Sequence, residues 1–219
     1  MKLSAKLILI SVLVIGVIGV SVVIDSVVQG DLAGTSDDSC NVAVIPLVGE
    51  ITSFDPGVYE EIDFADYEMT SADMVIAKLH QAEADRNIQG VLVRIDSPGG
   101  GPVASEMIMN TIKNLDLPVA ALIRESGSSG GYLAATGADT IIASAYSDVG
   151  GIGITMSYLE NSQQNAQNGL EYVQLSSGKY KDSYSPDKPL TSDERALAER
   201  DLAIWKRVFV GEVAENRNM

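Results

Sequence analysis

The chain has 219 residues and a formal net charge of −15, from 30 acidic and 15 basic side chains. This length is enough for one α/β domain with its own core, and the acidic balance argues against nucleic acid or an anionic membrane surface as a partner. Cys40 is the only cysteine, which excludes an intramolecular disulfide and a thiolate metal cluster.

The first predicted element is a transmembrane helix at the N-terminus. Leu7–Ile24 is apolar apart from two glycines and two serines, and a helix of this length covers about 27 Å of a hydrocarbon core about 30 Å thick. Lys2 and Lys6 precede it and Asp25 follows, so the positive-inside rule predicts a cytoplasmic N-terminus and an extracytoplasmic remainder. We expect a single-pass signal anchor of the cell membrane at 1–25, with a cleaved signal peptide as the alternative.

The rest of the chain divides into a linker and one domain. Residues 26–40 are polar and aperiodic, as expected of a linker, and 41–219 are predicted to form the domain. There, apolar runs of strand length alternate with segments of helical period. The predicted strands are 41–51, 89–95, 118–123 and 140–143, the predicted helices are 71–84, 103–115, 132–136 and 192–214, and 52–69 is a predicted loop. This alternation indicates βαβ units and a mostly parallel sheet.

Two of the predicted strand-to-helix turns are rich in glycine. The first is DSPGGG at 96–101, and the second contains Ser128-Ser129-Gly130-Gly131. Glycine permits backbone conformations that leave N–H groups at a helix start available to an anion or an oxyanion. Ser129 therefore stands where a nucleophile is found, although a serine before a helix is more often a simple cap.

A serine nucleophile needs a general base. His80 is the only histidine and lies on a predicted amphipathic, mostly solvated helix, so a triad through it has little support. The known alternative is a lysine that is neutral at the working pH, which requires surroundings that lower its pKa from about 10.4. The segment SGKYKDSYSP at 177–186 offers Lys179 and Lys181, yet two lysines beside a tyrosine are most often surface residues.

Four segments taken together resemble the signal peptide peptidase A family. They are VLVRIDSPGGG (91–101), SGSSGGYLAATGAD (126–139), VGGIGI (149–154) and SGKYKDSYSP (177–186), in the family's order and spacing. The resemblance covers roughly residues 41–215 and implies a ClpP/crotonase-like α/β fold. It also implies a serine endopeptidase with a Ser–Lys dyad that degrades signal peptide remnants or other membrane-associated peptides. Members of the family are homo-oligomers with active sites shared between protomers.

The family's site residues carry over position by position. The nucleophile is the serine directly before Gly-Gly-Tyr, which is Ser129 in this chain, and Ser128 is the alternative. The base is the lysine directly after the motif tyrosine, which is Lys181, whereas Lys179 is expected to be a solvated neighbour. No metal or cofactor is expected. The resemblance places the oxyanion donors at the backbone amides of Gly100 and Gly130.

Two features depart from the family pattern. Where the family has Gly-Ser-x-Gly, with a serine that helps to hold the lysine, this chain has Gly151 at the serine position. A water, Ser147 or Asp148 is a candidate substitute, and Gly151→Ser is expected to match or raise the rate if Lys181 is loosely held. The sequence also stops at Met219, in what reads as the middle of a longer family domain, so a truncated C-terminus is expected.

Two other functions stay open at this stage. One is a catalytically silent membrane scaffold of the same fold, with Gly151 as its sign. The other is a crotonase-like acyl-CoA enzyme, because such enzymes also use paired backbone amides as an oxyanion hole. The predicted export signal argues against the second, since acyl-CoA is a cytosolic substrate. Peptide specificity and oligomer size do not follow from the sequence.

Overall fold

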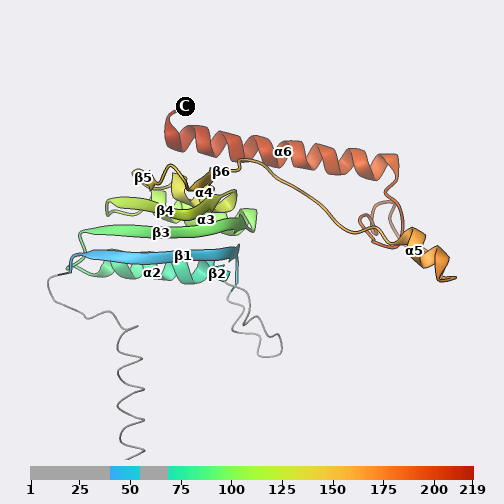
Figure 1. Cartoon of the computed structure of the whole chain (residues 1–219), viewed down its shortest axis with the longest axis horizontal. Helices are drawn as coiled ribbons and strands as arrows, with labels where there is room; N and C mark the ends of the chain where they lie inside the picture. The colour runs from blue at the N-terminus through green and yellow to red at the C-terminus, as the bar shows by residue number, and fades with distance from the viewer. Residues whose placement is uncertain (1–39, 55–68) are drawn as a thin grey trace, which may run out of the picture. The chain divides into compact units, whose positions relative to one another are not determined.

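The computed structural model describes residues 40–54 and 69–219 (Figure 1). Asn41–Met219 form one structural unit. The anchor predicted at 1–25 lies outside the described residues, as do nearly all of the linker and most of the predicted loop at 52–69. Among the helices that are described, none is long and apolar enough to cross a membrane.

The described strands form one six-stranded sheet. Its order is β2–β1–β3–β4–β5, and β6 also pairs with β4. Every pairing in the sheet is parallel, which confirms the predicted α/β architecture, while the short strands β2 and β6 are additions to the prediction. The strands are β1 (Val42–Thr52), β2 (Met69–Ser71), β3 (Gly90–Gly100), β4 (Val119–Ser128), β5 (Thr140–Ala143) and β6 (Asp148–Gly150).

Pro46 lies in β1 at a place where the strand has a single described partner. Its register partner is Arg94 of β3, and β2 pairs only with residues 50–52 of β1. On its other side Pro46 therefore faces no strand within the described residues, and a residue without an N–H group is tolerated there.

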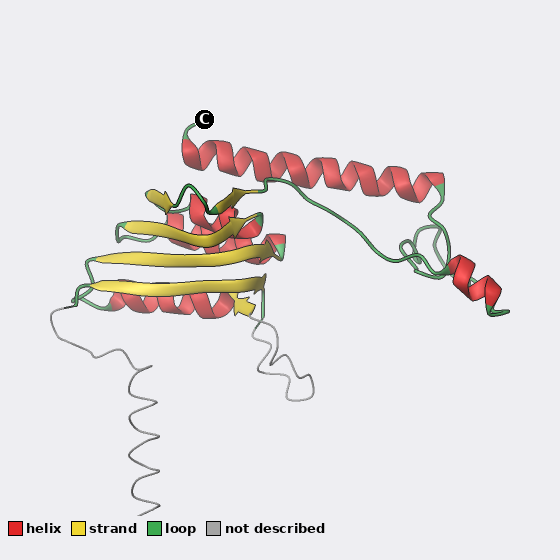
Figure 2. Cartoon of the chain, in the orientation of Figure 1, coloured by secondary structure: helices red, strands yellow, loops and turns green. Residues whose placement is uncertain are grey.

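Three helices pack against one face of the sheet (Figure 2). They are α2 (Ala72–Ala84), α3 (Pro102–Lys113) and α4 (Gly130–Thr136). Alternate strand residues point towards these helices because side chains alternate between the two faces of a strand. The strand residues of this core are Ile45, Leu47, Ile51, Val91, Val93, Ile95, Val119, Ala121 and Ile123. On the other face Val44 is 54% exposed, so the described helices bury the sheet on one side only.

The chain after β6 contains two further helices, α5 (Ser162–Gln167) and α6 (Ser192–Arg217). Helix α6 confirms the helix predicted at 192–214. It begins with a capping box, in which the Glu194 N–H donates to Thr191 Oγ1 and the Glu194 carboxylate accepts the Thr191 N–H. Such a reciprocal pair satisfies backbone donors that would have no partner within the helix.

The C-terminal half of α6 packs on the helical layer. Phe209 and Val213 are buried against Met109 of α3 and Leu133 of α4. Trp205, one helical turn before Phe209, remains 46% exposed. Helix α6 is therefore attached to the layer through its last turns, while its middle keeps apolar side chains at the surface.

Candidate active site

The first glycine-rich turn lies at the junction of β3 and α3. Strand β3 continues through Gly99 and Gly100, which have φ values of +102° and +154°, conformations that favour glycine. The hydroxyl of Ser97, fully buried beneath the turn, donates to the Gly49 carbonyl at 2.6 Å and accepts the Gly99 N–H at 3.0 Å. This buried hydroxyl fixes the turn to the end of β1.

Ser129 lies in the second turn, between the end of β4 and the start of α4. Its backbone has φ +51° and ψ −122°, which is an uncommon conformation for a residue other than glycine. Its N–H donates to the Gly150 carbonyl at 2.7 Å, and its carbonyl accepts the Leu133 N–H at 3.0 Å. A strained serine on a sharp strand-to-helix turn is how α/β hydrolases expose a nucleophilic hydroxyl. The geometry of Ser129 therefore exceeds what a helix cap requires.

The two turns are in close backbone contact. A Cβ atom on Gly99 would lie 2.6 Å from the Gly130 nitrogen and 2.9 Å from Ser129 Cβ, and one on Gly130 would lie 3.3 Å from the Gly100 nitrogen. The turns are also joined by the Ser126 N–H, which donates to Asp96 Oδ1 at 3.1 Å. The amide nitrogens of Gly100 and Gly130 are thus close to each other and beside Ser129, as an oxyanion hole requires.

Ser128 and Gly151 occupy the side of the turn next to β6. Gly151 has φ +62°, and a Cβ atom there would lie 2.5 Å from Ser128 Oγ and 3.2 Å from the Ser129 nitrogen. A side chain at position 151 is therefore strained and crowds the serine pair. The geometry argues against the expectation that Gly151→Ser matches or raises the rate, because Ser128 Oγ must move to admit a side chain at this strained position.

Two residues that had been considered as helpers have other partners. The Ser147 hydroxyl donates to the Arg124 carbonyl and accepts the Ser144 N–H. His80 lies on α2 with a side chain that is 62% exposed and pairs with Glu83 at 3.5 Å. The prediction of a solvated His80 is confirmed, and its side-chain partner within the described residues is Glu83 rather than a serine.

Lys181 lies in a turn at 176–185, in the irregular segment between α5 and α6. Its side chain is exposed, its N–H donates to the Gly178 carbonyl at 3.1 Å, and no hydrogen bond within the described residues joins it to Ser129. The neighbouring Lys179 is exposed and paired with Asp193 at 2.6 Å, which raises the pKa of Lys179. The structure thus brings together Ser129, Gly100 and Gly130, but not Lys181.

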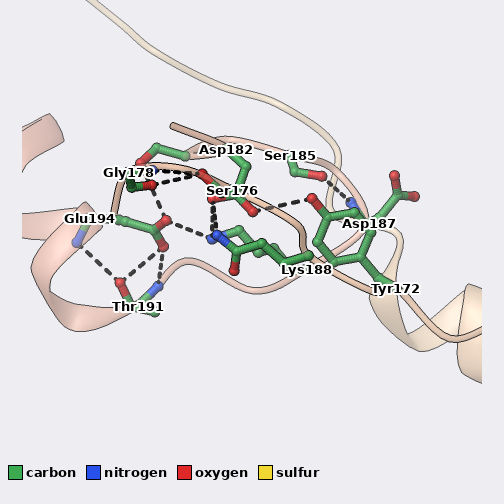
Figure 3. Close-up of polar contacts among 11 residues, drawn as sticks. Tyr172, Ser176, Gly178, Asp182, Ser185, Asp187, Lys188, Thr191 and Glu194 are labelled. Carbon is green, nitrogen blue, oxygen red and sulfur yellow. Dashed lines mark hydrogen bonds and ion pairs between the residues drawn. The ribbon is translucent and has the colours of Figure 1, made fainter. Parts of the chain in front are cut away.

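The turn of Lys181 is attached to the start of α6 by a group of charged residues (Figure 3). Lys188 Nζ lies 2.6 Å from Glu194 Oε1 and 3.7 Å from Asp182 Oδ1, and the Glu194 side chain is only 2% exposed. The Lys188 ammonium, together with the Thr191 N–H, lowers the pKa of Glu194 to about 2, and Glu194 in turn raises the pKa of Lys188. Sequence reasoning missed this group, although Thr191-x-x-Glu194 is a recognisable capping-box pattern.

The site thus consists of a strained serine beside two glycine amides on a parallel α/β sheet, an arrangement that can serve acyl transfer. Comparison with known sequences identifies the family. The sequence profile of peptidase family S49 matches residues 112–219, which include both Ser129 and Lys181. A Clp protease profile matches residues 63–147. The chain belongs to peptidase family S49, the signal peptide peptidase A family, and so to a family of proteases.

The sequence relatives support this membership. A Methanocaldococcus jannaschii protein named as a protease is 30% identical over the whole chain and 70% of its own length. An Enterococcus faecium protein named as a signal peptide peptidase is 34% identical over 66% of the chain. The chloroplastic serine protease SPPA of Arabidopsis thaliana is 28% identical over 68% of the chain. The chain spans only 43% of the Enterococcus protein and 22% of the Arabidopsis protein.

Two solved structures also match in part. ClpP1 from Listeria monocytogenes aligns with 43% of this chain and 46% of its own, at 22% identity and a TM-score of 0.34. A membrane-bound stomatin-specific protease aligns with 55% of this chain and 51% of its own, at 23% identity and a TM-score of 0.40.

Proposed function

We propose that this protein is a serine endopeptidase in which Ser129 is the nucleophile and Lys181 the general base. The observation that carries the proposal is the strained turn of Ser129, which lies beside the amides of Gly100 and Gly130. The proposed substrates are signal peptide remnants or other membrane-associated peptides, and the finer fold assignment is ClpP/crotonase-like. The chemistry requires no metal or cofactor.

The proposed reaction has two halves. Lys181, in its neutral form, accepts the proton of Ser129 Oγ while this oxygen bonds to the peptide carbonyl carbon. The carbonyl oxygen becomes an oxyanion that accepts hydrogen bonds from the Gly100 and Gly130 N–H groups, and one such donor is worth about 3–4 kcal/mol. Lys181 then protonates the leaving amine as the C–N bond breaks. A water molecule, deprotonated by Lys181, finally hydrolyses the acyl-enzyme.

The base is proposed to come from a second copy of the chain. Lys181 is held near Glu194 at the start of α6, whereas the helix that follows Ser129 packs near Phe209. Glu194 and Phe209 are about 22 Å apart along a helix that rises 1.5 Å per residue. The exposed apolar residues of α6 supply a surface for such association: Ile204 is 45%, Trp205 46% and Val208 52% exposed.

A mixing experiment tests the shared site. The single variants Ser129→Ala and Lys181→Ala are each expected to be inactive in cleaving an apolar peptide. When equal amounts are assembled together, about a quarter of the sites contain an intact serine and an intact lysine from different copies, and activity should return to about that level. A mixture as inactive as its components would contradict the shared site. Ser128→Ala is the control and should retain most activity.

The cellular location is also a proposal. It places 1–25 as a membrane anchor with a cytoplasmic N-terminus and the peptidase domain on the extracytoplasmic side, supported by Lys2 and Lys6 ahead of the apolar run. Protease added to intact cells should then digest an epitope at the C-terminus. Protection of this epitope until the cells are lysed would rule out the orientation.

Two observations favour a second candidate, a catalytically silent scaffold of the same fold. No hydrogen bond within the described residues joins Lys181 to Ser129, and Gly151 stands in place of the family's serine. A fluorophosphonate probe distinguishes the two functions, because it reacts with a serine hydroxyl only where the site activates it. Labelling that is abolished by Ser129→Ala supports the peptidase. A protein that takes up no label and cleaves no peptide in its assembled form supports the scaffold.

A further inference from the structure

The turn that carries Lys181 is fixed by a partly buried charge cluster, defined here as Asp182, Lys188 and Glu194 (Figure 3). Lys188 is its centre: the side chain is 17% exposed and its ammonium lies between the carboxylates of Glu194, which is 2% exposed, and Asp182, which is 16% exposed. Charges with so little access to water are stable only when paired, and the loss of one partner leaves an uncompensated charge. Removal of any one of the three charged groups is therefore expected to destabilise the other two.

Each carboxylate of the charge cluster also accepts neutral donors. Asp182 accepts the Tyr172 hydroxyl at 3.2 Å and the Gln174 amide at 2.7 Å. Glu194 accepts the Thr191 N–H at 2.8 Å and the Ser183 hydroxyl at 3.2 Å. Asp182 and Ser183 directly follow Lys181 in the sequence, so the backbone on that side of the lysine is fixed to α6.

A third contact holds the end of the same turn. Tyr184 has φ +69°, a left-handed conformation that is uncommon outside glycine. Its ring packs edge-to-face on Tyr158, with ring centroids 6.2 Å apart and an interplanar angle of 79°. Tyr158 belongs to the segment that leaves β6, so the turn is braced against α6 on one side and against this segment on the other. The Lys181 side chain is exposed, but the backbone of its turn is held in place by these contacts.

We propose that the charge cluster of Asp182, Lys188 and Glu194 positions Lys181, so that its amino group is presented in the direction that catalysis requires. This inference rests on the proposed function, in which Lys181 is the base. Lys188 is a positioning residue, because it acts through the backbone of the turn and touches no reacting atom. A misplacement of about 1 Å in a reacting group can cost up to about 100-fold in rate.

The full chain with Lys188→Met tests the inference, since methionine keeps an unbranched apolar side chain and removes the ammonium. The expected result is a fall in kcat of about 10- to 100-fold, with KM within about twofold. Lys188→Arg should recover at least half of the activity, because a guanidinium can bridge both carboxylates. The matched control is Lys179→Met. It removes a lysine of the same turn, but the ion pair of Lys179 with Asp193 is exposed, so this variant should leave kcat unchanged.

A pH profile separates positioning from a merely structural role. Lys188 lowers the pKa of Glu194 to about 2, and Glu194 raises the pKa of Lys188 from its ordinary value, so neither group titrates near neutral pH. A rise in kcat with pH in this range therefore reports the proposed base, Lys181. In Lys188→Met the midpoint of this rise should move, because the surroundings of the base have changed. The same midpoint with a lower plateau, with no recovery in Lys188→Arg, would overturn the inference, as would wild-type kcat in Lys188→Met.

The two levels of the proposal fail separately. If Lys181→Ala cleaves peptide at the wild-type rate, Lys181 is not the base and the proposed function itself is wrong. If Lys181→Ala is inactive while Lys188→Met behaves as wild type, the base stands and the positioning role falls. Circular dichroism of each variant at 25 °C shows whether the fold is kept. If Lys188→Met has lost the fold, Glu194→Gln takes its place, and the same fall in kcat and the same shifted midpoint are expected.

Discussion

Gly99→Ala is expected to inactivate the protein without unfolding it. Position 99 has φ +102°, and the added Cβ would lie 2.6 Å from the Gly130 nitrogen, 2.9 Å from Ser129 Cβ and 3.0 Å from the Ser128 carbonyl oxygen. Ordinary contacts of this kind begin at about 3.4 Å, so the two turns must separate by several tenths of an ångström or more. Backbone strain of this kind costs about 1–3 kcal/mol, against a total stability of about 5–15 kcal/mol.

The effect on catalysis is larger than the effect on stability. Separation of the turns moves the Gly130 amide away from the Gly100 amide, and the loss of one oxyanion donor lowers kcat by about 100- to 1,000-fold. Peptide cleavage and thermal unfolding of the same preparation measure the two effects. Gly101→Ala is the matched control, because a Cβ atom there meets nothing closer than 3.5 Å, and it should keep near wild-type activity. A folded, fully active Gly99→Ala protein would refute the proposed oxyanion hole.

Three further predictions concern the serine pair, the base and the start of α6. Gly151→Ser should lower peptide cleavage, since a side chain at φ +62° would lie 2.5 Å from Ser128 Oγ. The double variant Gly151→Ser with Ser128→Ala should recover part of the lost activity. If it recovers none, the contact with Ser128 is not the cause of the loss. Lys181→Arg should be inactive because a guanidinium does not release its proton at working pH, while His80→Ala should cleave normally, and the reverse result would refute a lysine base. The pKa of Glu194 is about 2 against an ordinary 4.5, so its contribution to stability is complete above about pH 4.5 and is lost as the pH falls towards 2. The melting temperature should therefore fall more steeply in this range than in Glu194→Gln, and parallel curves would contradict the charge cluster.

The sequence predicted the parts of the molecule that depend on local pattern. Runs such as Gln89–Ile95 have the length and composition of strands, so the βαβ order could be predicted. The glycines at 99–101 and 130–131 indicate sharp turns, so the position of Ser129 in a turn could be predicted as well. It missed that β3 continues through Gly100, because this extension depends on pairing with Ile51 of β1. The hydrophobic period along one strand does not reveal which other strand pairs with it.

The setting of Lys181 could not be predicted for a related reason. Residues 151–191 contain little regular structure, so no helical or strand period marks which of their side chains are buried. Glu194 is buried and Lys188 partly buried because of tertiary contacts between the turn and α6, whereas charged residues are by default expected at the surface. Only the capping pattern at Thr191 pointed to this place.

The attachment of Ser97 to Gly49 has a consequence for when the protein can act. The hydroxyl of Ser97 bonds a carbonyl 48 positions earlier in the chain, and Ser129 is held by the carbonyl of Gly150, which comes after it. Contacts so distant in sequence form slowly, because the chain between them must be closed first. No segment shorter than 49–150 contains all these contacts. A newly made chain therefore cannot assemble the turn of Ser129 until Gly150 has been synthesised.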